Sequence, residues 1–224
     1  METPQAPDMN RRRFLGLAGA AAASVAAAGA IAGVGSVATV DAAAPLLGSL
    51  SAPAFGAINV FETVPDGSQR VIKPSSLNVR GAGHIATTPL PGQRGVSVIA
   101  GHRTTSPRPF YNLHKTKVGD LITWTPAGGP AVQFKVVEIA VLGDITWRKA
   151  TLPDGTQGTE AEATFVEIMD PVVKYGSDTR LNLYACTRPP YAGQPWRVTG
   201  AGQSIPSARP TSTSYRLAVF AVKV

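Results

Sequence analysis

The sequence predicts a mainly β domain, built as a barrel or sandwich of mostly antiparallel strands. Beyond about Val60, runs rich in Val, Ile, Thr, Phe and Tyr alternate with turn residues at strand-like spacing. The 224 residues include 23 Gly and 19 Pro, often in the turn dipeptides Pro-Gly, Gly-Gly and Asp-Gly. Helix signals are sparse, and the length allows one hydrophobic core rather than two full domains.

Residues 1–44 read as a twin-arginine signal peptide or a membrane anchor. Arg11 and Arg12 stand at the head of the stretch R-R-R-F-L, and an uncharged run rich in Ala and Gly extends from Phe14 to Val40. A paired Arg before such a run is typical of a twin-arginine export signal, whereas about 20 apolar residues suffice to span a bilayer. Both interpretations place the domain outside the cytoplasm. Residues 45–59, rich in Pro, Ala, Gly and Ser, are expected to form a flexible spacer.

Residues 60–224 are expected to form the folded domain. A short helical turn is predicted near Pro109–Leu113, where apolar side chains would face inward. The best strand candidates are bounded by Gly, Pro, Asp or Asn. They are Val96–Ala100, Asp120–Thr125, Ala131–Leu142, Ala163–Met169, Arg180–Cys186 and Tyr215–Val224.

Composition excludes several classes of function. With one Cys the chain has no internal disulfide and no zinc cage of cysteines, and its three His are scattered, so a structural metal is not expected. The net charge of +7 is dispersed along the chain without an aromatic-interleaved basic stripe, which argues against a nucleic-acid partner. No glycine-rich phosphate loop and no GxSxG motif is present.

Two strand ends carry the residue types of thiol catalysis. Cys186 ends the alternating run R-L-N-L-Y-A-C, and His102 follows the apolar run V-S-V-I-A-G. A single Cys and a His on separate strand ends are the minimum for nucleophilic catalysis, in which the imidazole serves as general base and acid. The alternative is a buried Cys that acts only as a small hydrophobic residue. An Arg near the Cys would supply donors for the oxyanion of a tetrahedral intermediate.

Three segments resemble the sortases, the cysteine transpeptidases of Gram-positive surfaces, and are closest to the class E type of actinobacteria. The stretch from Gly83 to Leu113, G-H-I-A-T-T-P-L-P-G-Q-R-G-V-S-V-I-A-G-H-R-T-T-S-P-R-P-F-Y-N-L, is similar to the histidine region of that family. K-V-G-D-L-I-T-W and L-N-L-Y-A-C-T-R-P resemble its next strand and its cysteine strand. The resemblance covers Gly83 to the C-terminus and implies a closed β-barrel of about eight strands with short helices.

The resemblance also implies roles for particular residues. His102 matches the catalytic His of the family and Cys186 its nucleophile, while His84 matches an upstream position that is structural or lines the substrate. Tyr184 and Ala185 precede the nucleophile and are expected to contact substrate. The loop after the Cys is rich in Pro and aromatic residues, including Trp196, which is expected to wall the substrate groove.

The catalytic Arg has two candidates. Arg216 stands in Y-R-L-A-V-F-A, which has the form of the family's final strand, and it is favoured. Arg197, in Q-P-W-R-V-T-G, lies closer in sequence to Cys186 but would leave a strand-like tail unexplained. Two departures from the family pattern are Ala185 and Asn182, where sortases usually carry Thr. Loss of a hydroxyl donor there could lower the rate by about 100-fold.

The implied reaction is cleavage of the Thr–Gly bond in a sorting motif of the LPxTG or LAxTG kind, a chemistry that needs no cofactor. The expected partners are surface proteins with such a motif, an amine acceptor such as the lipid II crossbridge or a pilin Lys, and the membrane through the N-terminal segment. Two alternatives stay open. One is a catalytically weak sortase-fold module that binds sorting motifs, and the other is another extracytoplasmic thiol peptidase, such as one that acts on peptidoglycan.

Other conspicuous residues are expected to be structural. Trp124 and Trp147 read as core or barrel-rim residues, and His114 reads as a solvated surface residue. Asp154, Glu160 and Glu162 fall in a stretch rich in Gly and Thr, which is expected to be a solvated loop rather than a metal site.

Overall fold

The computed structural model describes residues 44–63, 81–104, 106, 108–152, 154–169, 177–206 and 214–224. The chain divides into two compact units, Met1–Asp41 and Ala42–Val224, and every described residue belongs to the second. The predicted signal or anchor therefore lies outside the described residues, apart from Ala44. Within the described ranges, no helix is long and apolar enough to cross a membrane.

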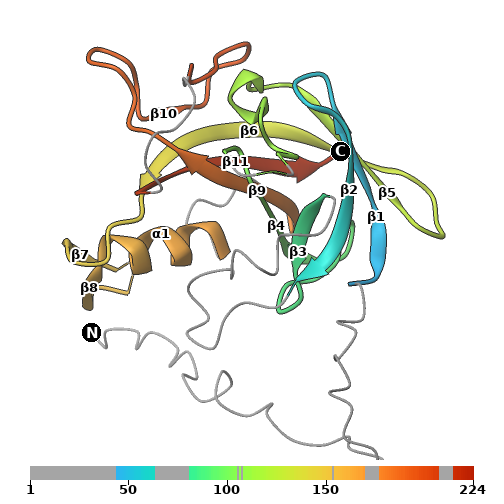
Figure 1. Ribbon diagram of the computed structural model, residues 1–224, viewed down its shortest axis with the longest axis horizontal. Coiled ribbons are helices and arrows are strands. Elements are labelled where there is room, and N and C mark those ends of the chain that lie inside the picture. The colour runs from blue at the N-terminus through green and yellow to red at the C-terminus, as the bar shows by residue number, and fades with distance from the viewer. Residues whose placement is uncertain are drawn as a thin grey trace, which may run out of the picture. The chain divides into compact units, whose positions relative to one another are not determined.

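The fold is mainly β, with one α-helix among the described residues (Figure 1). Five of the six predicted strands are confirmed as β4, β5, β6, β9 and β11, and the predicted turn near Pro109–Leu113 leads into a short 3-10 helix, η3 (Leu113–Lys115). The strands are β1 (Leu46–Ala52), β2 (Gly56–Thr63), β3 (Ala82–Ile85), β4 (Gly95–Gly101), β5 (Leu121–Pro126), β6 (Val132–Gly143), β7 (Lys149–Thr151), β8 (Gln157–Thr159), β9 (Thr179–Thr187), β10 (Arg197–Val198) and β11 (Tyr215–Lys223).

The large sheet closes on itself, which confirms the predicted barrel. Its nine strands run in the order β10-β6-β11-β9-β4-β3-β2-β1-β5, and a further pairing of β5 with β6 joins the two ends. Eight strands thus form the barrel, and β10 is an added edge on β6. The pairs β2–β3 and β4–β9 are parallel, whereas the other pairs are antiparallel. Closure leaves fewer open edges to pair with other chains.

The prediction of a flexible spacer over residues 45–59 is wrong. Strand β1 and the first part of β2 occupy this segment, and β1 pairs with both β2 and β5. Leu50 and Val60 are fully buried in the barrel core. The polar and small residues between them alternate with these apolar ones, so the segment has a half-buried strand pattern that its Pro, Ala and Gly content concealed.

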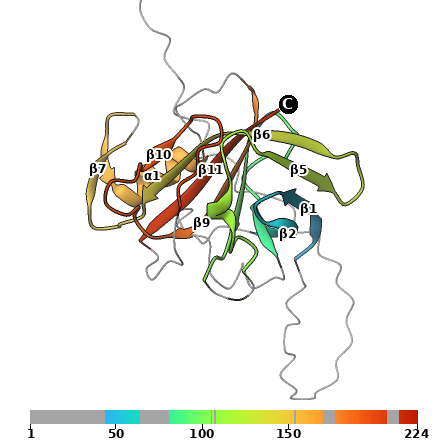
Figure 2. The same cartoon turned by 90° about the horizontal axis from the view of Figure 1, so that it is seen from above.

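Two hydrophobic clusters fill the domain. One takes residues from all eight barrel strands and therefore lies inside the barrel, with Trp124 and Phe134 among its largest members. The other joins Ile168 of helix α1 (Glu160–Met169) to Ala100, Ala218 and other residues of β3, β4, β6 and β11. Because alternate residues of a strand point to opposite faces, this second cluster lies on the outer face, where α1 packs against the sheet (Figure 2).

The prediction of a strand over Ala163–Met169 is wrong, because this segment belongs to α1. The helix begins with a reciprocal capping box. The backbone N–H of Thr159 donates to Glu162 Oε2 at 2.7 Å, and the N–H of Glu162 donates to Thr159 Oγ1 at 3.2 Å. Glu160 and Glu162 thus form the first turn of a helix, where their negative charge suits the helix dipole, rather than a solvated loop.

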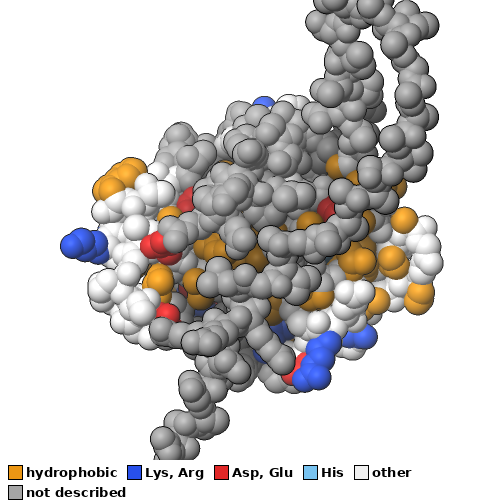
Figure 3. Space-filling view, turned by 90° about the horizontal axis from the view of Figure 1, so that it is seen from below, with side chains coloured by type: hydrophobic (Ala, Val, Ile, Leu, Met, Phe, Trp, Pro, Cys, Tyr) orange, Lys and Arg blue, Asp and Glu red, His pale blue; other side chains and the backbone are white. Residues whose placement is uncertain are grey.

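Two further expectations can be compared with the structure. Trp124 is 2% exposed, as predicted, whereas Trp147 is 82% exposed in the loop after β6 and is therefore not a core residue. In Figure 3, basic side chains are visible at the left, the top and the lower right, where several lie close together, and hydrophobic side chains are visible between these edges.

Candidate active site

Strand β9 carries Cys186 and lies between β4 and β11. In the register, Ala185 is opposite Gly101 of parallel β4, and Cys186 is opposite Arg216 of antiparallel β11. His102 follows Gly101 directly, just as Cys186 follows Ala185. The topology therefore brings the three predicted catalytic residues to neighbouring positions on three adjacent strands.

The alternation along these strands places Cys186 and Arg216 on the outer face. Leu183 and Ala185 belong to the cluster inside the barrel, so Tyr184 and Cys186 point outward. On β11, Leu217 lies inside and Ala218 outside, so Arg216 also points outward. His102 continues the outward series of β4 that includes Val98 and Ala100.

Arg216 reaches the sulfur of Cys186. Its Nη1 donates to Cys186 Sγ at 3.6 Å and to the carbonyl oxygen of Tyr215 at 3.3 Å. Its Nη2 forms an ion pair with Asp144 Oδ2, and both of these side chains are 17% exposed. Asp144 follows β6, the other neighbour of β11, and its backbone N–H donates to Ser214 O at 2.8 Å. The carboxylate therefore orients the guanidinium toward the sulfur. Asp144 was not identified from the sequence. Its position at the end of a predicted strand that could pair with the strand of Arg216 was a signal that could have found it.

The turn after β4 holds His102 in place. The backbone N–H of Phe110 donates to His102 O at 3.1 Å, and the Phe110 ring packs on Gly101, where an added Cβ would lie 2.5 Å from the ring. A side chain at position 101 would push this turn away, so the close approach requires Gly. The buried Nε2 of His102 has no hydrogen-bond partner among the described residues, so it offers an unengaged ring nitrogen.

Arg103 is a second residue that sequence reasoning missed. Its side chain is 1% exposed and donates to the carbonyl oxygen of Cys186 and to the hydroxyl of Thr187. Burial lowers the pKa of Arg103 to about 10, with Cys186 and Tyr111 offsetting part of this effect, so the guanidinium stays charged at neutral pH. Its position directly after His102 is the sequence signal that could have identified it.

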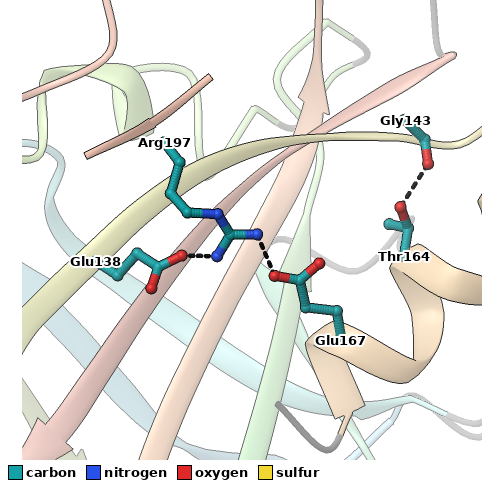
Figure 4. Close-up of polar contacts among 5 residues, drawn as sticks. All are labelled: Glu138, Gly143, Thr164, Glu167 and Arg197. Carbon is teal, nitrogen blue, oxygen red and sulfur yellow. Dashed lines mark hydrogen bonds and ion pairs between the residues drawn. The ribbon is translucent and has the colours of Figure 1, made fainter. Parts of the chain in front are cut away.

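Arg197 lies elsewhere. It stands on β10, and both β6 and β11 separate it from β9 in the sheet. Its Nη1 pairs with Glu138 of β6, and its Nη2 pairs with Glu167 of α1 (Figure 4). Burial lowers the pKa of Arg197 and raises the pKa of Glu167. Arg197 therefore ties an edge strand to the barrel and the helix, whereas Arg216 is the Arg at Cys186.

The four predicted substrate contacts fall in different places. Tyr184 lies on the outer face two residues before Cys186, and burial raises the pKa of its phenol while Arg216 opposes the shift. Trp196 is 49% exposed, and its ring centroid is 5.7 Å from that of Tyr215, beside Arg216. Both residues therefore lie near Arg216, Tyr184 on β9 and Trp196 through its contact with Tyr215.

Ala185 is a correction, and His84 takes the structural one of its two expected roles. Ala185 is 2% exposed and its side chain lies inside the barrel, so only its backbone can face substrate. His84 is 2% exposed on β3, where its Nε2 lies 3.1 Å from Pro89 O and 3.2 Å from Thr88 Oγ1. Burial lowers the pKa of His84, and these partners make it a structural residue.

Asn182, the other departure from the family pattern, holds α1 to the sheet. Its Nδ2 donates to Ile168 O near the end of the helix at 2.7 Å. His114 is likewise structural rather than a solvated surface residue, because it is half-buried and its Nδ1 lies 3.0 Å from Arg103 Nη2. No group of three or more potential metal ligands occurs within the described residues.

Comparison with known proteins decides the family. The sortase domain model matches residues 50–201, which is more than half of the chain. The chain belongs to the sortase family. The matched range includes His102, Arg103 and Cys186 but ends before β11 and Arg216. No match was found among curated protein sequences.

The chain is similar to several solved sortase structures at low sequence identity. A lid mutant of sortase A from Corynebacterium diphtheriae is 21% identical with a TM-score of 0.50, over 82% of this chain and 73% of that one. A point mutant of sortase E from Streptomyces avermitilis is 24% identical with a TM-score of 0.47, over 80% and 87%. A pilus-related sortase C of group B Streptococcus is 22% identical with a TM-score of 0.47, over 80% and 67%. Family membership implies cysteine transpeptidase activity.

Proposed function

We propose that this sortase cleaves the Thr–Gly bond of an LPxTG-like or LAxTG-like motif through Cys186, His102 and Arg216. The observation that carries the proposal is the contact of 3.6 Å between Arg216 Nη1 and Cys186 Sγ, with His102 at the end of the strand on the other side of β9. A cysteine sulfur between a fixed cation and an imidazole has the groups that thiol acyl transfer needs.

In the acylation step, the Cys186 thiolate attacks the carbonyl carbon of the motif's Thr. A C–S bond forms, and the carbonyl oxygen becomes an oxyanion that Arg216 and backbone N–H groups stabilise. The C–N bond to Gly then breaks, and His102 gives a proton to the leaving amine. Asp144 keeps the Arg216 guanidinium in the orientation that serves both sulfur and oxyanion.

In the transfer step, an amine attacks the thioester carbon and loses a proton to His102. A C–N bond forms, the C–S bond breaks and the thiolate returns. The proposed acceptors are the peptide crossbridge of lipid II and a pilin Lys, with water as a slower substitute. Tyr184 and the Trp196–Tyr215 pair are proposed to line the groove for the sorting motif.

The class E type and a location outside the cytoplasm are part of the proposal. The motifs between Gly83 and Leu113 support the class, and the paired Arg11 and Arg12 before an apolar run support export or anchoring through the N-terminal segment. The motif-binding module without catalysis has less support. That alternative was motivated by Ala185 and Asn182, which stand where sortases usually carry Thr. The Ala185 side chain packs in the barrel core and Asn182 binds α1, so both residues have structural roles.

The test is intact-mass analysis of the chain with LPxTG and LAxTG peptides at neutral pH, with and without an amine acceptor. We expect a mass increase that equals the part of the peptide up to and including the motif's Thr. This adduct should be absent in Cys186→Ala and should disappear when the amine acceptor is added. A folded protein whose Cys186 reacts with a small thiol reagent but forms no adduct with either peptide would contradict the proposed substrate. An adduct from a peptidoglycan stem peptide instead would move the assignment to a peptidoglycan-acting thiol enzyme.

A further inference from the structure

The proposed mechanism leaves one buried cation beside Cys186 without a role. Arg103 donates through Nη1 to the Cys186 carbonyl oxygen at 3.4 Å and to Thr187 Oγ1 at 3.1 Å. Its Nε donates to Tyr111 O at 3.4 Å, and its Nη2 lies 3.0 Å from His114 Nδ1. One side chain thus connects the end of β9 to the turn that follows His102.

Burial of a guanidinium is costly unless its donors are satisfied, so a buried Arg must be held by its surroundings. The planar fork of Arg directs its donors rigidly, which lets one residue set the geometry of several segments. Arg103 achieves this between the cysteine strand and the histidine loop. Because His102 directly precedes Arg103 in the chain and Cys186 O accepts its hydrogen bond, a shift of the Arg103 side chain would move the two catalytic groups relative to each other.

The contact with His114 constrains the protonation of that imidazole. His114 Nδ1 lies 3.0 Å from Arg103 Nη2, which only donates, and 3.2 Å from the carbonyl oxygen of Tyr111, which only accepts, so the same nitrogen either accepts from Arg103 or donates to Tyr111. Burial and the Arg103 charge both lower the pKa of His114, in agreement with this geometry. At neutral pH the lowered pKa favours the neutral imidazole, which packs against Arg103 in the turn after His102.

We propose that Arg103 is a positioning residue, whose buried fork sets the placement of Cys186 relative to His102 and adds a fixed positive charge behind the thiolate. The catalytic part of this inference rests on the proposed function, whereas the part that concerns thiol reactivity does not.

The charged and titratable groups around Cys186 come from every element packed against it. Arg216 approaches from β11 with Asp144 as its ion-pair partner, Tyr184 lies on β9 itself, and His102 and Arg103 approach from the end of β4. Asp144 offsets part of the Arg216 charge. A second cation therefore contributes to the stability of the thiolate.

The test compares Arg103→Met and Arg103→Lys with the control Arg108→Met, an exposed Arg in the same loop. Cys186 is the only Cys of the chain, so alkylation of the full chain by iodoacetamide reports this thiol alone. In Arg103→Met the pH profile of alkylation is expected to move to higher pH by about one pH unit, which lowers the rate at pH 7 by about tenfold. Arg103→Lys restores the charge and is expected to return this profile toward wild type.

Turnover of the sorting peptide separates positioning from charge. Displacement of a catalytic group by about 1 Å can cost about 100-fold in rate, so kcat is expected to fall by about that factor in Arg103→Met with little change in KM. Arg103→Lys lacks the fork and is expected to keep a reduced kcat. If folded Arg103→Met matches Arg108→Met in both the alkylation profile and kcat, the inference is wrong.

A second variant and the alkylation assay still test the inference if Arg103→Met does not fold or if the chain shows no turnover. If Arg103→Met does not fold, Thr187→Val removes one acceptor of the fork and keeps the side-chain shape, and unchanged kcat in this variant would overturn the inference. If the wild-type chain forms no acyl-enzyme with any peptide, the proposed function fails. The alkylation profiles still decide the role of Arg103, because they require no substrate.

Discussion

Replacement of Arg197 by Met tests whether this Arg stabilises the fold rather than the reaction. The variant removes the cation that pairs with Glu138, a carboxylate whose side chain is only 3% exposed, and with Glu167, which is 28% exposed. Removal of one partner from a buried ion pair costs about 3–5 kcal/mol. Because 40% of the Arg197 side chain is exposed and water can reach the site, we expect a lower cost, about 2 kcal/mol.

A loss of about 2 kcal/mol should lower the melting temperature by about 4–8 °C in a protein of this size. Thermal unfolding followed by circular dichroism measures the shift. Arg148→Met is the matched control, since Arg148 also pairs with α1, at 3.3 Å from Glu160, but is 57% exposed. An exposed pair of this kind is worth about 0–1 kcal/mol, so its removal should change the melting temperature little.

The same variant decides between the two candidate catalytic Arg residues. At equal folded fraction, Arg197→Met should form the acyl-enzyme at the wild-type rate, whereas Arg216→Met should not form it. An Arg197→Met protein with an unchanged melting temperature would refute the structural role. A well-folded Arg197→Met protein that fails to acylate would refute the assignment of Arg216.

Three further predictions follow from the geometry. Arg216→Lys keeps the charge but loses the fork that serves both Cys186 and Asp144, so kcat should fall by at least about 100-fold in a peptide-cleavage assay, and wild-type turnover would contradict the role of the guanidinium. Burial lowers the pKa of His84 in the folded protein, so the unfolded chain binds a proton at this imidazole more readily. The stability that neutral His84 contributes is therefore present above about pH 6.5, and it is lost as the pH falls through the lowered pKa of the folded state. Urea unfolding should therefore show lower stability at pH 5 than at pH 7.5, with a weaker dependence in His84→Gln, and identical pH dependence in the two proteins would contradict this account. A chain that begins at Ala54 lacks β1, which pairs with both β2 and β5, so it should melt at a lower temperature than a chain that begins at Ala42; equal melting temperatures would show that β1 does not close the barrel.

The strands that were predicted correctly share strong local signals. Alternating apolar residues bounded by Gly, Pro or Asp marked β4, β6, β9 and β11, because side chains on a barrel strand alternate between core and outer face. The errors came from composition. Residues 45–59 looked like a spacer because Ala and Gly are common there, yet Leu50 and other apolar residues alternate at the period of a strand.

Helix α1 shows a different kind of error. Its sequence offered β-type residues near Phe165 and Ile168, and this content favoured a strand. The capping box of Thr159 and Glu162 was visible in the sequence and outweighs that preference, because it satisfies backbone donors at the helix start. The outer face of the sheet then supplies the apolar surface that Ile168 needs.

The barrel class, the family motifs and the candidate residues for thiol chemistry could all be predicted from the sequence alone, since apolar alternation and the residues at strand ends are local features. The tertiary structure decided which Arg approaches the sulfur. Arg197 is closer to Cys186 in sequence than Arg216 is, but strand pairing rather than sequence separation sets distance in a closed sheet, and β11 is the strand beside β9. The same pairing placed Asp144 against Arg216 and turned the Ala185 side chain into the core. Contacts between segments far apart in the chain depend on the register of the whole barrel, which no local pattern contains.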